Sequence, residues 1–189
     1  MPKKYSGTLF LITGNSSSGK DSIISRTIER FPKNLKKAYL VKRYITREAS
    51  DFENNNCITE EEFKEMDQQG KFALKWHIYN LDYGVPIEID NWLKEGHPVL
   101  VNVSRTLVEK ARKLYANLKV VFIYVPLETT IKRIKERGRE KSEVLKERIE
   151  RAKSFQRFPE ADFVVDNSGE LNESIDQLLN YILSVIREN

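Results

Sequence analysis

Two glycines and a lysine in the segment "GNSSSGKDS" have the spacing of a loop that wraps the phosphates of a nucleotide. Gly14, Gly19 and Lys20 fit the pattern G-x-x-x-x-G-K. Glycines allow backbone N–H groups to face phosphate oxygens, and the lysine can neutralise the β- and γ-phosphates. We therefore expect a triphosphate to be bound by Gly14, Asn15, Ser16, Ser17, Ser18, Gly19, Lys20, Asp21 and Ser22.

The residue after the lysine departs from the usual pattern of such loops, in which a serine or threonine hydroxyl holds a magnesium ion. This chain has Asp21 at that position, and a carboxylate is a stronger oxygen ligand for Mg²⁺ than a hydroxyl. Ser22, one residue further on, could instead supply the hydroxyl while Asp21 caps the start of a helix. The sequence leaves both residues as candidate ligands of Mg²⁺.

Arginines at regular spacing occur in two other segments. In "KRYITREA", Arg43 and Arg47 are four residues apart, so an extended chain would place both on one face, toward one anion. In "IKRIKERGRE", Arg133 and Arg137 lie one helical turn apart, and the glycine that follows frees the backbone to present Arg139. Phosphoryl transfer needs cations around the migrating group, so this second segment is expected to close over the reactants.

The segment from about residue 133 to about residue 157 is expected to form this basic lid. From Lys132 to Arg157 there are eleven Lys or Arg and five Glu, whereas the whole chain has a net charge of only +4. The interleaved glutamates would repel the backbone of a nucleic acid, and no aromatic-rich strand accompanies them. We therefore expect a phosphorylated small molecule as the partner, and no nucleic acid. A solvated helix face remains the alternative for the lysines of the segment.

The spacing of the histidines and the cysteine along the chain does not predict a metal site. His77 and His97 are in different segments, and neither has a ligand partner at helical spacing, which argues against zinc. His77 precedes the turn "DYGV" and is a candidate for contact with a substrate. Cys57 is the only cysteine, so no internal disulfide is expected.

Short β-branched runs alternate with amphipathic helical patterns along the chain. The strands "TLFLIT", "VLVNVS", "VVFIYV" and "DFVVD" are apolar enough to be buried on both faces of a parallel sheet. Helices are expected after the glycine loop, from Thr59 to Gly70 with a capping box, and along an apolar stripe from Leu171 to Ile186. This alternation predicts an α/β fold of three layers, with helices on both faces of a parallel central sheet. The interval of about 39–84 mixes short strands with one helix and is expected to form a small substrate-binding lobe.

Composition indicates one folded domain that spans residues 1–189. Hydrophobic residues make up 40% of the chain and charged residues 32%, which is too apolar for a disordered protein. The apolar run near the N-terminus is too short for a signal peptide or a membrane span, so we expect a cytoplasmic protein without membrane contact. The oligomeric state is left open, with a homodimer among the alternatives.

The combination of "GNSSSGKDS", "RYITREA", "DYGV" and "RIKERGRE" resembles the guanylate-kinase-like branch of the P-loop kinases over nearly the whole chain. The segments "GKDS", "RYITR", "LKWHIYNLDYGVPIEIDNWL" and "VLVNVSR" are more closely similar to the ribose 1,5-bisphosphate phosphokinase family, PhnN. This resemblance implies transfer of the γ-phosphoryl group of ATP to the 1-phosphate of ribose 1,5-bisphosphate. The products would be 5-phosphoribosyl 1-diphosphate and ADP, and Asp21 would be a trait of the family.

Two departures from true guanylate kinases agree with this resemblance. Around the acceptor phosphate, the sequences of those enzymes are similar to the pattern T-T-R-x-x-R-x-G-E-x-x-G-x-x-Y. This chain has Ser50 in place of the second arginine of that pattern and Cys57 in place of its tyrosine. The following strand, which in those enzymes usually ends in acidic residues near guanine, here ends in Asn102, Ser104 and Arg105. A neutral to basic pocket suits a sugar bisphosphate better than a base that needs carboxylate acceptors.

The resemblance also implies roles for individual residues, with Mg²⁺ on Asp21 or Ser22. The residues expected around the acceptor are Arg43, Arg47 and Tyr83, with Glu53, His77, Asn102 and Arg105 as further candidates. Those expected to act on the migrating phosphoryl group are Lys20, Arg133, Arg137, Arg139 and Arg148. Two alternatives remain. One is a guanylate kinase or another nucleoside monophosphate kinase, and the other is a non-catalytic guanylate-kinase-like module, which would be expected to lack the loop lysine.

Overall fold

Parallel strands form the central sheet of the computed structural model, which describes residues 1–48, 55–137 and 142–188 of the chain. In spatial order the strands of this sheet are β2 (Tyr39–Leu40), β7 (Val99–Asn102), β1 (Leu9–Gly14), β8 (Leu118–Tyr124) and β9 (Phe163–Asp166). The four strands expected from their apolar runs are confirmed. The two-residue edge strand β2 was not expected, because a pair of residues carries no recognisable period.

The central strand β1 is buried on both faces. Leu9, Phe10, Leu11 and Ile12 are all fully buried, and β1 pairs with β7 on one side and β8 on the other. Helices on both faces must exclude water, since unbroken apolar runs of this kind occur in covered parallel sheets. The strand thus brings Gly14 to the carboxyl edge of the sheet, where ligands of open α/β folds bind.

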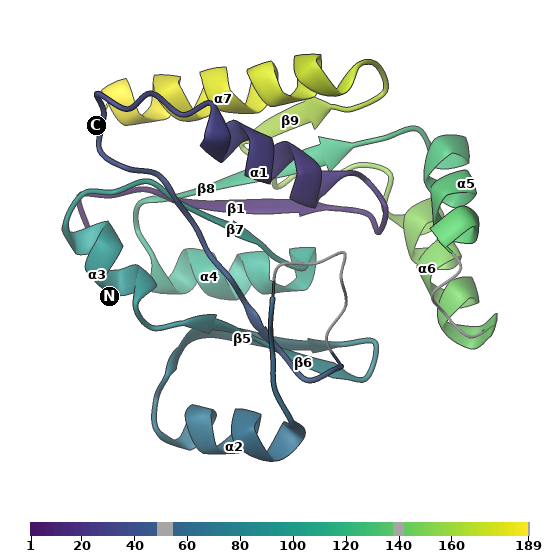
Figure 1. Ribbon diagram of the computed structural model, residues 1–189, viewed down its shortest axis with the longest axis horizontal. Coiled ribbons are helices and arrows are strands. Elements are labelled where there is room, and N and C mark those ends of the chain that lie inside the picture. Colours follow the sequence, from purple (N-terminus) through teal and green to yellow (C-terminus); the bar gives the residue numbers. More distant parts are fainter. Residues whose placement is uncertain (49–54, 138–141, 189) are drawn as a thin grey trace.

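Helices cover both faces of the sheet, which confirms the predicted three-layer α/β fold (Figure 1). On one face α1 (Lys20–Glu29) and α7 (Leu171–Glu188) pack on Phe10, Ile12 and Val165. The other face is covered by α3 (Ile89–Lys94), the short 3₁₀ helix η1 (Arg105–Leu107) and α4 (Val108–Leu114). None of the described helices is long and apolar enough to cross a membrane.

A second, mostly antiparallel sheet lies below α4 in Figure 1. Its strands are, in order, β4 (Asn56–Cys57), β3 (Tyr44–Ile45), β6 (Leu81–Pro86) and β5 (Phe72–Ile78). The helix α2 (Glu60–Gln68) packs beside this sheet and begins with the expected capping box: Thr59 Oγ1 accepts from the Glu62 backbone N–H at 3.1 Å, and Glu62 Oε2 accepts from the Thr59 N–H at 2.7 Å.

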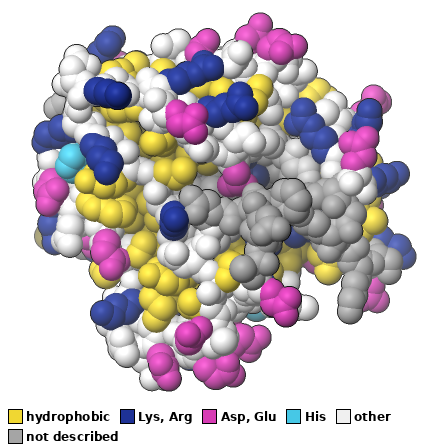
Figure 2. All heavy atoms as spheres, viewed as in Figure 1, with side chains coloured by type: hydrophobic (Ala, Val, Ile, Leu, Met, Phe, Trp, Pro, Cys, Tyr) yellow, Lys and Arg dark blue, Asp and Glu magenta, His cyan; other side chains and the backbone are white. Residues whose placement is uncertain are grey.

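Two further helices, α5 (Leu127–Arg137) and α6 (Ser142–Ser154), stand together at the right of Figure 1. The space-filling view shows acidic side chains gathered at the lower end of the molecule, over α2, whose first turn holds Glu60, Glu61 and Glu62 (Figure 2). Basic side chains on this face are scattered over the upper part, along the right edge and at the lower left (Figure 2). The basic surplus of the chain is therefore not presented as one continuous basic surface on this side.

A buried carboxylate ties the N-terminal segment to α3 and α4. Asp90 is only 7% exposed, and it accepts hydrogen bonds from Lys3 Nζ at 2.6 Å and from the Tyr115 hydroxyl at 2.7 Å. Burial, followed by the hydrogen bond to Asp90, raises the pKa of the Tyr115 hydroxyl well above its ordinary value. The hydroxyl therefore stays protonated at neutral pH and donates to Asp90.

Removal of this donor should destabilise the fold. We expect Tyr115→Phe to lower the free energy of unfolding by about 2 kcal/mol, because the buried Asp90 loses a hydrogen bond to a charged acceptor. Urea denaturation followed by circular dichroism measures the change. Tyr181→Phe is the matched control, since its ring stack on Phe163 is unaffected, and it should change stability by less than about 0.5 kcal/mol. Equal stabilities for the two variants would contradict the role of Asp90.

Candidate active site

The loop between β1 and α1 adopts backbone angles that require its glycines. Gly14 and Gly19 have φ of 153° and 82°, and Ser17 has φ of 61°. A Cβ atom at Gly19 would stand 2.9 Å from Asn167 Nδ2, and one at Gly14 would stand 2.8 Å from the Ile123 carbonyl oxygen. No side chain caps the start of α1. The first backbone N–H groups of this helix therefore face the loop, and the helix N-terminus adds a partial positive charge there.

The ammonium group of Lys20 lies within the curve of this loop. It donates to the carbonyl oxygens of Gly14 at 3.0 Å and Asn15 at 2.8 Å, and to Ser18 Oγ at 3.3 Å. These three acceptors are neutral oxygens, and they hold the ammonium group within the loop. An anion that enters the loop would meet the lysine and the helix N-terminus together.

One cavity of about 600 Å³ joins this loop to arginines from four other parts of the chain. It is lined by the whole of the loop from Gly14 to Ser22 and by Arg43, Arg47, Arg105, Arg133, Arg148 and Arg151. Aromatic side chains complete its walls, namely Trp76, Tyr79, Tyr83 and Phe155. Among the lining residues that the structure describes, Asp21 is the one carboxylate. The cavity is therefore built to receive molecules with several negative charges.

Asp21 and Ser22 lie at the exposed start of α1, and both line the cavity. Asp21 Oδ1 accepts a hydrogen bond of 2.7 Å from Asn102 Nδ2, at the end of β7. In the described part of the chain, no three His, Cys, Asp or Glu side chains gather closely enough to hold a metal ion. One carboxylate and one hydroxyl beside a phosphate loop do fit Mg²⁺, which usually keeps several waters and completes its shell with substrate phosphates.

The second sheet contributes Arg43, Arg47 and Tyr83 to the same cavity. Arg43 precedes β3, is 8% exposed and donates from Nε to Asn55 Oδ1 at 3.3 Å. Its guanidinium carbon lies 5.7 Å from the centre of the Tyr83 ring, which in turn stacks on Trp76 at 5.0 Å. The predicted pair of arginines and the predicted tyrosine thus come together on one wall of the cavity.

Arg105 lies on the side of the phosphate loop, wedged among aromatic rings. Its Nη2 donates to Asn15 Oδ1 at 3.0 Å and to the Phe155 carbonyl oxygen at 3.1 Å, and its guanidinium carbon is 4.5 Å from the Phe155 ring centre. Burial, followed by the charge of Arg151, lowers the pKa of Arg105 to about 10, so the group is still cationic at neutral pH. Arg105 therefore reaches Asn15 of the loop as well as the cavity.

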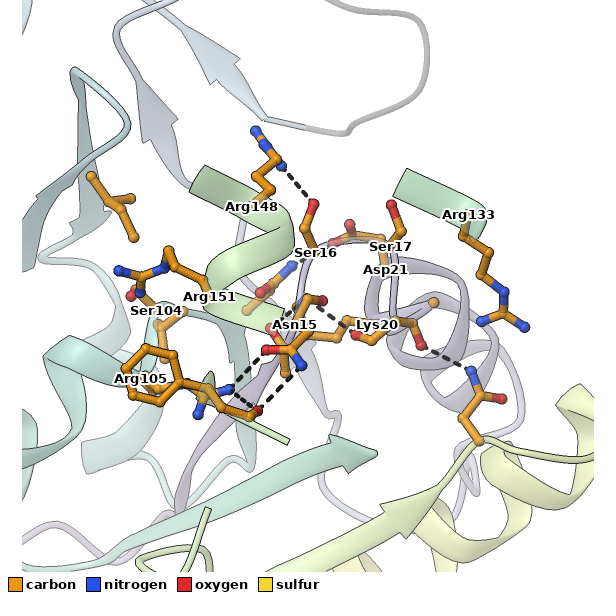
Figure 3. A pocket seen from close by; sticks show the side chains of 18 of the residues that line it. Asn15, Ser16, Ser17, Lys20, Asp21, Ser104, Arg105, Arg133, Arg148 and Arg151 are labelled. Atoms are coloured by element: carbon orange, nitrogen blue, oxygen red, sulfur yellow. Dashed lines mark hydrogen bonds between the residues drawn. The ribbon is translucent and has the colours of Figure 1, made fainter. Parts of the chain in front are cut away.

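The lid residues are only partly described. Arg148 on α6 donates from Nη1 to Ser16 Oγ at 2.6 Å, and Figure 3 shows it with Arg151 on one side of the loop and Arg133 of α5 on the other. The side chain of Arg137 and all of Arg139 lie outside the described residues, as does Glu53, which was predicted to contact the acceptor. Their predicted roles stay predictions.

His77 is the predicted site residue that the structure places apart from the others. Its Nδ1 lies 2.9 Å from Asp82 Oδ1 on the neighbouring strand, its side chain is largely exposed, and it is not among the described residues that line the cavity. Its contact with a substrate remains a prediction without support from this geometry.

Some lining residues were not singled out from the sequence. They are Trp76, Tyr79, Arg151, Phe155 and Asn167. Arg151 could have been found, since it follows Arg148 at helical i, i+3 spacing and therefore shares its face. The aromatic residues gave no such signal, because they reach the cavity only through contacts between segments that are far apart in the chain.

Comparison with known proteins agrees with this geometry. The guanylate kinase family profile matches residues 6–185. A protein of Pseudomonas paraeruginosa named ribose 1,5-bisphosphate phosphokinase PhnN is 36% identical over 178 residues, which cover 93% of this chain and 95% of that protein. Its namesake in Psychromonas ingrahamii is 35% identical, over 95% of this chain and 93% of that protein.

Among solved structures, the guanylate kinase of Anaplasma phagocytophilum superposes with a TM-score of 0.71 at 17% sequence identity. The match covers 96% of this chain and 87% of that one, so the fold is shared over nearly the full length of both. The chain therefore belongs to the guanylate kinase family, and within that family its relatives are the proteins named ribose 1,5-bisphosphate phosphokinase PhnN.

Proposed function

We propose that the protein transfers the γ-phosphoryl group of ATP to the 1-phosphate of ribose 1,5-bisphosphate, which gives 5-phosphoribosyl 1-diphosphate and ADP. The observation that carries this proposal is a cavity whose described lining residues include a phosphate loop, six arginines and, as the one carboxylate among them, Asp21. The named relatives, at 35–36% identity over most of the chain, supply the identity of the acceptor. In the reaction the bond from the γ-phosphorus to the bridging oxygen breaks, and a new bond forms from that phosphorus to an oxygen of the 1-phosphate.

At the donor end, the loop from Gly14 to Gly19 binds the phosphates of ATP through its backbone N–H groups, and Lys20 neutralises the β- and γ-oxygens. Asp21 or Ser22 holds Mg²⁺, and Asn102 orients the Asp21 carboxylate through its hydrogen bond. When bound there, Mg²⁺ would supply positive charge that offsets the negative charge of the phosphates.

At the acceptor end, Arg43, Arg47 and Tyr83 bind the phosphates of the sugar. A guanidinium group can bind two phosphate oxygens at once, which fixes the acceptor as well as attracting it. The attacking oxygen of a phosphate monoester is already ionised near pH 7, so this reaction needs no general base. Catalysis therefore consists of alignment and charge stabilisation, and the lid arginines Arg133 and Arg148 act on the migrating group. We assign Arg137 and Arg139 the same role.

A guanylate kinase activity is the second candidate, because the family profile and the fold are those of guanylate kinases. A guanine base offers N–H donors, which call for acceptors such as carboxylates in its pocket. Among the described lining residues the one carboxylate, Asp21, belongs to the phosphate loop. This distribution favours an acceptor made of phosphates and hydroxyl groups over one that carries guanine.

A panel of acceptors separates these two activities. We expect ADP release, measured with a coupled enzyme assay, to be at least tenfold faster with ribose 1,5-bisphosphate than with GMP, AMP or buffer alone, because the cavity supplies cations rather than acceptors for a base. A preference for GMP would show that the acceptor proposal is wrong and that the protein is a nucleoside monophosphate kinase.

The loop lysine should be required for turnover. We expect Lys20→Ala to lower kcat by at least about 100-fold, because charge on the migrating phosphoryl group is no longer neutralised. Lys132→Ala is the matched control, since that lysine lies on α5 with its side chain 75% exposed, and its kcat should stay within twofold of the unmodified protein. Thermal melts of both variants check the fold. A loss of less than fivefold for Lys20→Ala would remove the proposed role.

The metal ligand can be identified by titration with magnesium. We expect Asp21→Ala to raise the Mg²⁺ concentration for half-maximal activity several-fold, because the carboxylate that faces the cavity is lost. Ser22→Ala, made in parallel, removes the neighbouring hydroxyl and should shift the titration less. The reverse order of the two shifts would assign the ion to Ser22 and leave Asp21 only as the acceptor of the hydrogen bond from Asn102.

A further inference from the structure

The tip of the β5–β6 hairpin has a tyrosine where its backbone disfavours one. Ile78 pairs with Leu81, so the turn consists of Tyr79 and Asn80, which have φ of 55° and 58°. Two-residue hairpin turns with positive φ at both positions prefer Asn and Gly, because a Cβ atom is strained there and Asn is tolerated best after Gly. Tyr79 is therefore a poor choice for the turn alone, which points to a role for its side chain.

The ring of Tyr79 lies against two arginines of the lid helix α6. The guanidinium carbon of Arg148 is 4.6 Å from the ring centre, and that of Arg151 is 5.7 Å from it. Burial raises the pKa of the Tyr79 hydroxyl, although both arginines oppose this shift, so the ring is neutral at physiological pH. The face of a neutral aromatic ring attracts a guanidinium group without cancelling its charge.

Arg148 connects this contact to the phosphate loop. Its Nη1 donates to Ser16 Oγ at 2.6 Å, although the two residues are 132 positions apart. The hairpin that carries Tyr79 also carries Tyr83, on β6, at the acceptor wall. Three segments thus meet at Arg148: the acceptor hairpin through Tyr79, the lid through the arginine itself, and the donor loop through Ser16.

We propose that Tyr79 is a positioning residue that holds Arg148 over the phosphate loop, so that the acceptor hairpin and the lid arginine are set in place together. This inference rests on the proposed function, in which Arg148 stabilises the migrating phosphoryl group. The ring also lowers the cost of keeping Arg148 and Arg151, two like charges, side by side. ATP would still bind to the loop if Arg148 were misplaced. Loss of the Tyr79 ring should therefore lower kcat and leave the binding of ATP nearly unchanged.

Tyr79→Asn separates this role from a structural one, because Asn is better suited to the turn. We expect the melting temperature to stay the same or rise, while kcat falls about tenfold, which corresponds to about 1.4 kcal/mol of transition-state stabilisation. The KM for ATP should change less than threefold. Tyr79→Phe keeps the ring and should retain at least half of the kcat.

Asn80→Gly is the matched control, since it relaxes the same turn and leaves the contact between the ring and the arginines untouched. Its kcat should equal that of the unmodified protein. In an Arg148→Ala background, Tyr79→Asn should cost less than twofold, because the group that Tyr79 positions is gone. A Tyr79→Asn protein with more than half of the normal kcat, or a loss that is undiminished in the Arg148→Ala background, would overturn the proposal.

A second readout does not depend on the reaction. The arginine side-chain signals in ¹H–¹⁵N spectra, assigned by comparison with Arg148→Lys, should show a ring-current shift of Arg148 that disappears in Tyr79→Asn. No change in that signal would overturn the contact. If the unmodified protein releases no ADP with ribose 1,5-bisphosphate, the proposed function fails, and this spectrum still decides whether Tyr79 holds Arg148.

Discussion

Positive charge gathered in one cavity is the constraint on which the rest of the site depends. Lys20 and six arginines line the same space as one described carboxylate, and like charges at such distances repel one another. Among the contacts of Lys20, Arg105 and Arg148 are carbonyl, amide and hydroxyl oxygens and, for the two arginines, aromatic rings. Partners of this kind hold a cation in place and leave its charge available, whereas a carboxylate would neutralise it before a phosphate arrives. The aromatic walls of the cavity therefore help to hold its arginines in place without neutralising them.

The fold and the backbone geometry of the glycine loop could be predicted because their signals are local. The glycine loop, the apolar strands and the capping box of α2 each depend on a few consecutive residues, and the structure contains each of them. The strand β2, the helix α6 and the role of Tyr79 could not be found in this way. β2 consists of two residues, and the contact between Arg148 and Ser16 joins positions 132 apart. Asn102 was expected near the sugar. The structure shows that it also donates a hydrogen bond to Asp21, which no pattern in the sequence predicts.

Membership in the guanylate kinase family explains the architecture but not the choice of acceptor. The chain shares its fold with a guanylate kinase at only 17% identity, and one fold can carry different acceptor sites. We assign the choice of acceptor to the second sheet and to the end of β7, where Arg43, Tyr83 and Asn102 line the cavity. An acceptor that carries two phosphates needs little more than well-placed cations, so a cavity with few carboxylates is sufficient for it. Among the described lining residues, Asp21 of the phosphate loop is the one carboxylate that could accept from the N–H donors of a guanine base.

The most direct test of this account is to follow the phosphoryl group itself by ³¹P nuclear magnetic resonance. ATP, Mg²⁺, ribose 1,5-bisphosphate and the protein are mixed, and spectra are recorded over time. The account predicts that the γ-phosphate signal of ATP and the sugar 1-phosphate signal decline together while the two coupled signals of a new diphosphate grow in equal amount. Release of the γ-phosphate only as inorganic phosphate, with the sugar 1-phosphate signal unchanged, would contradict it.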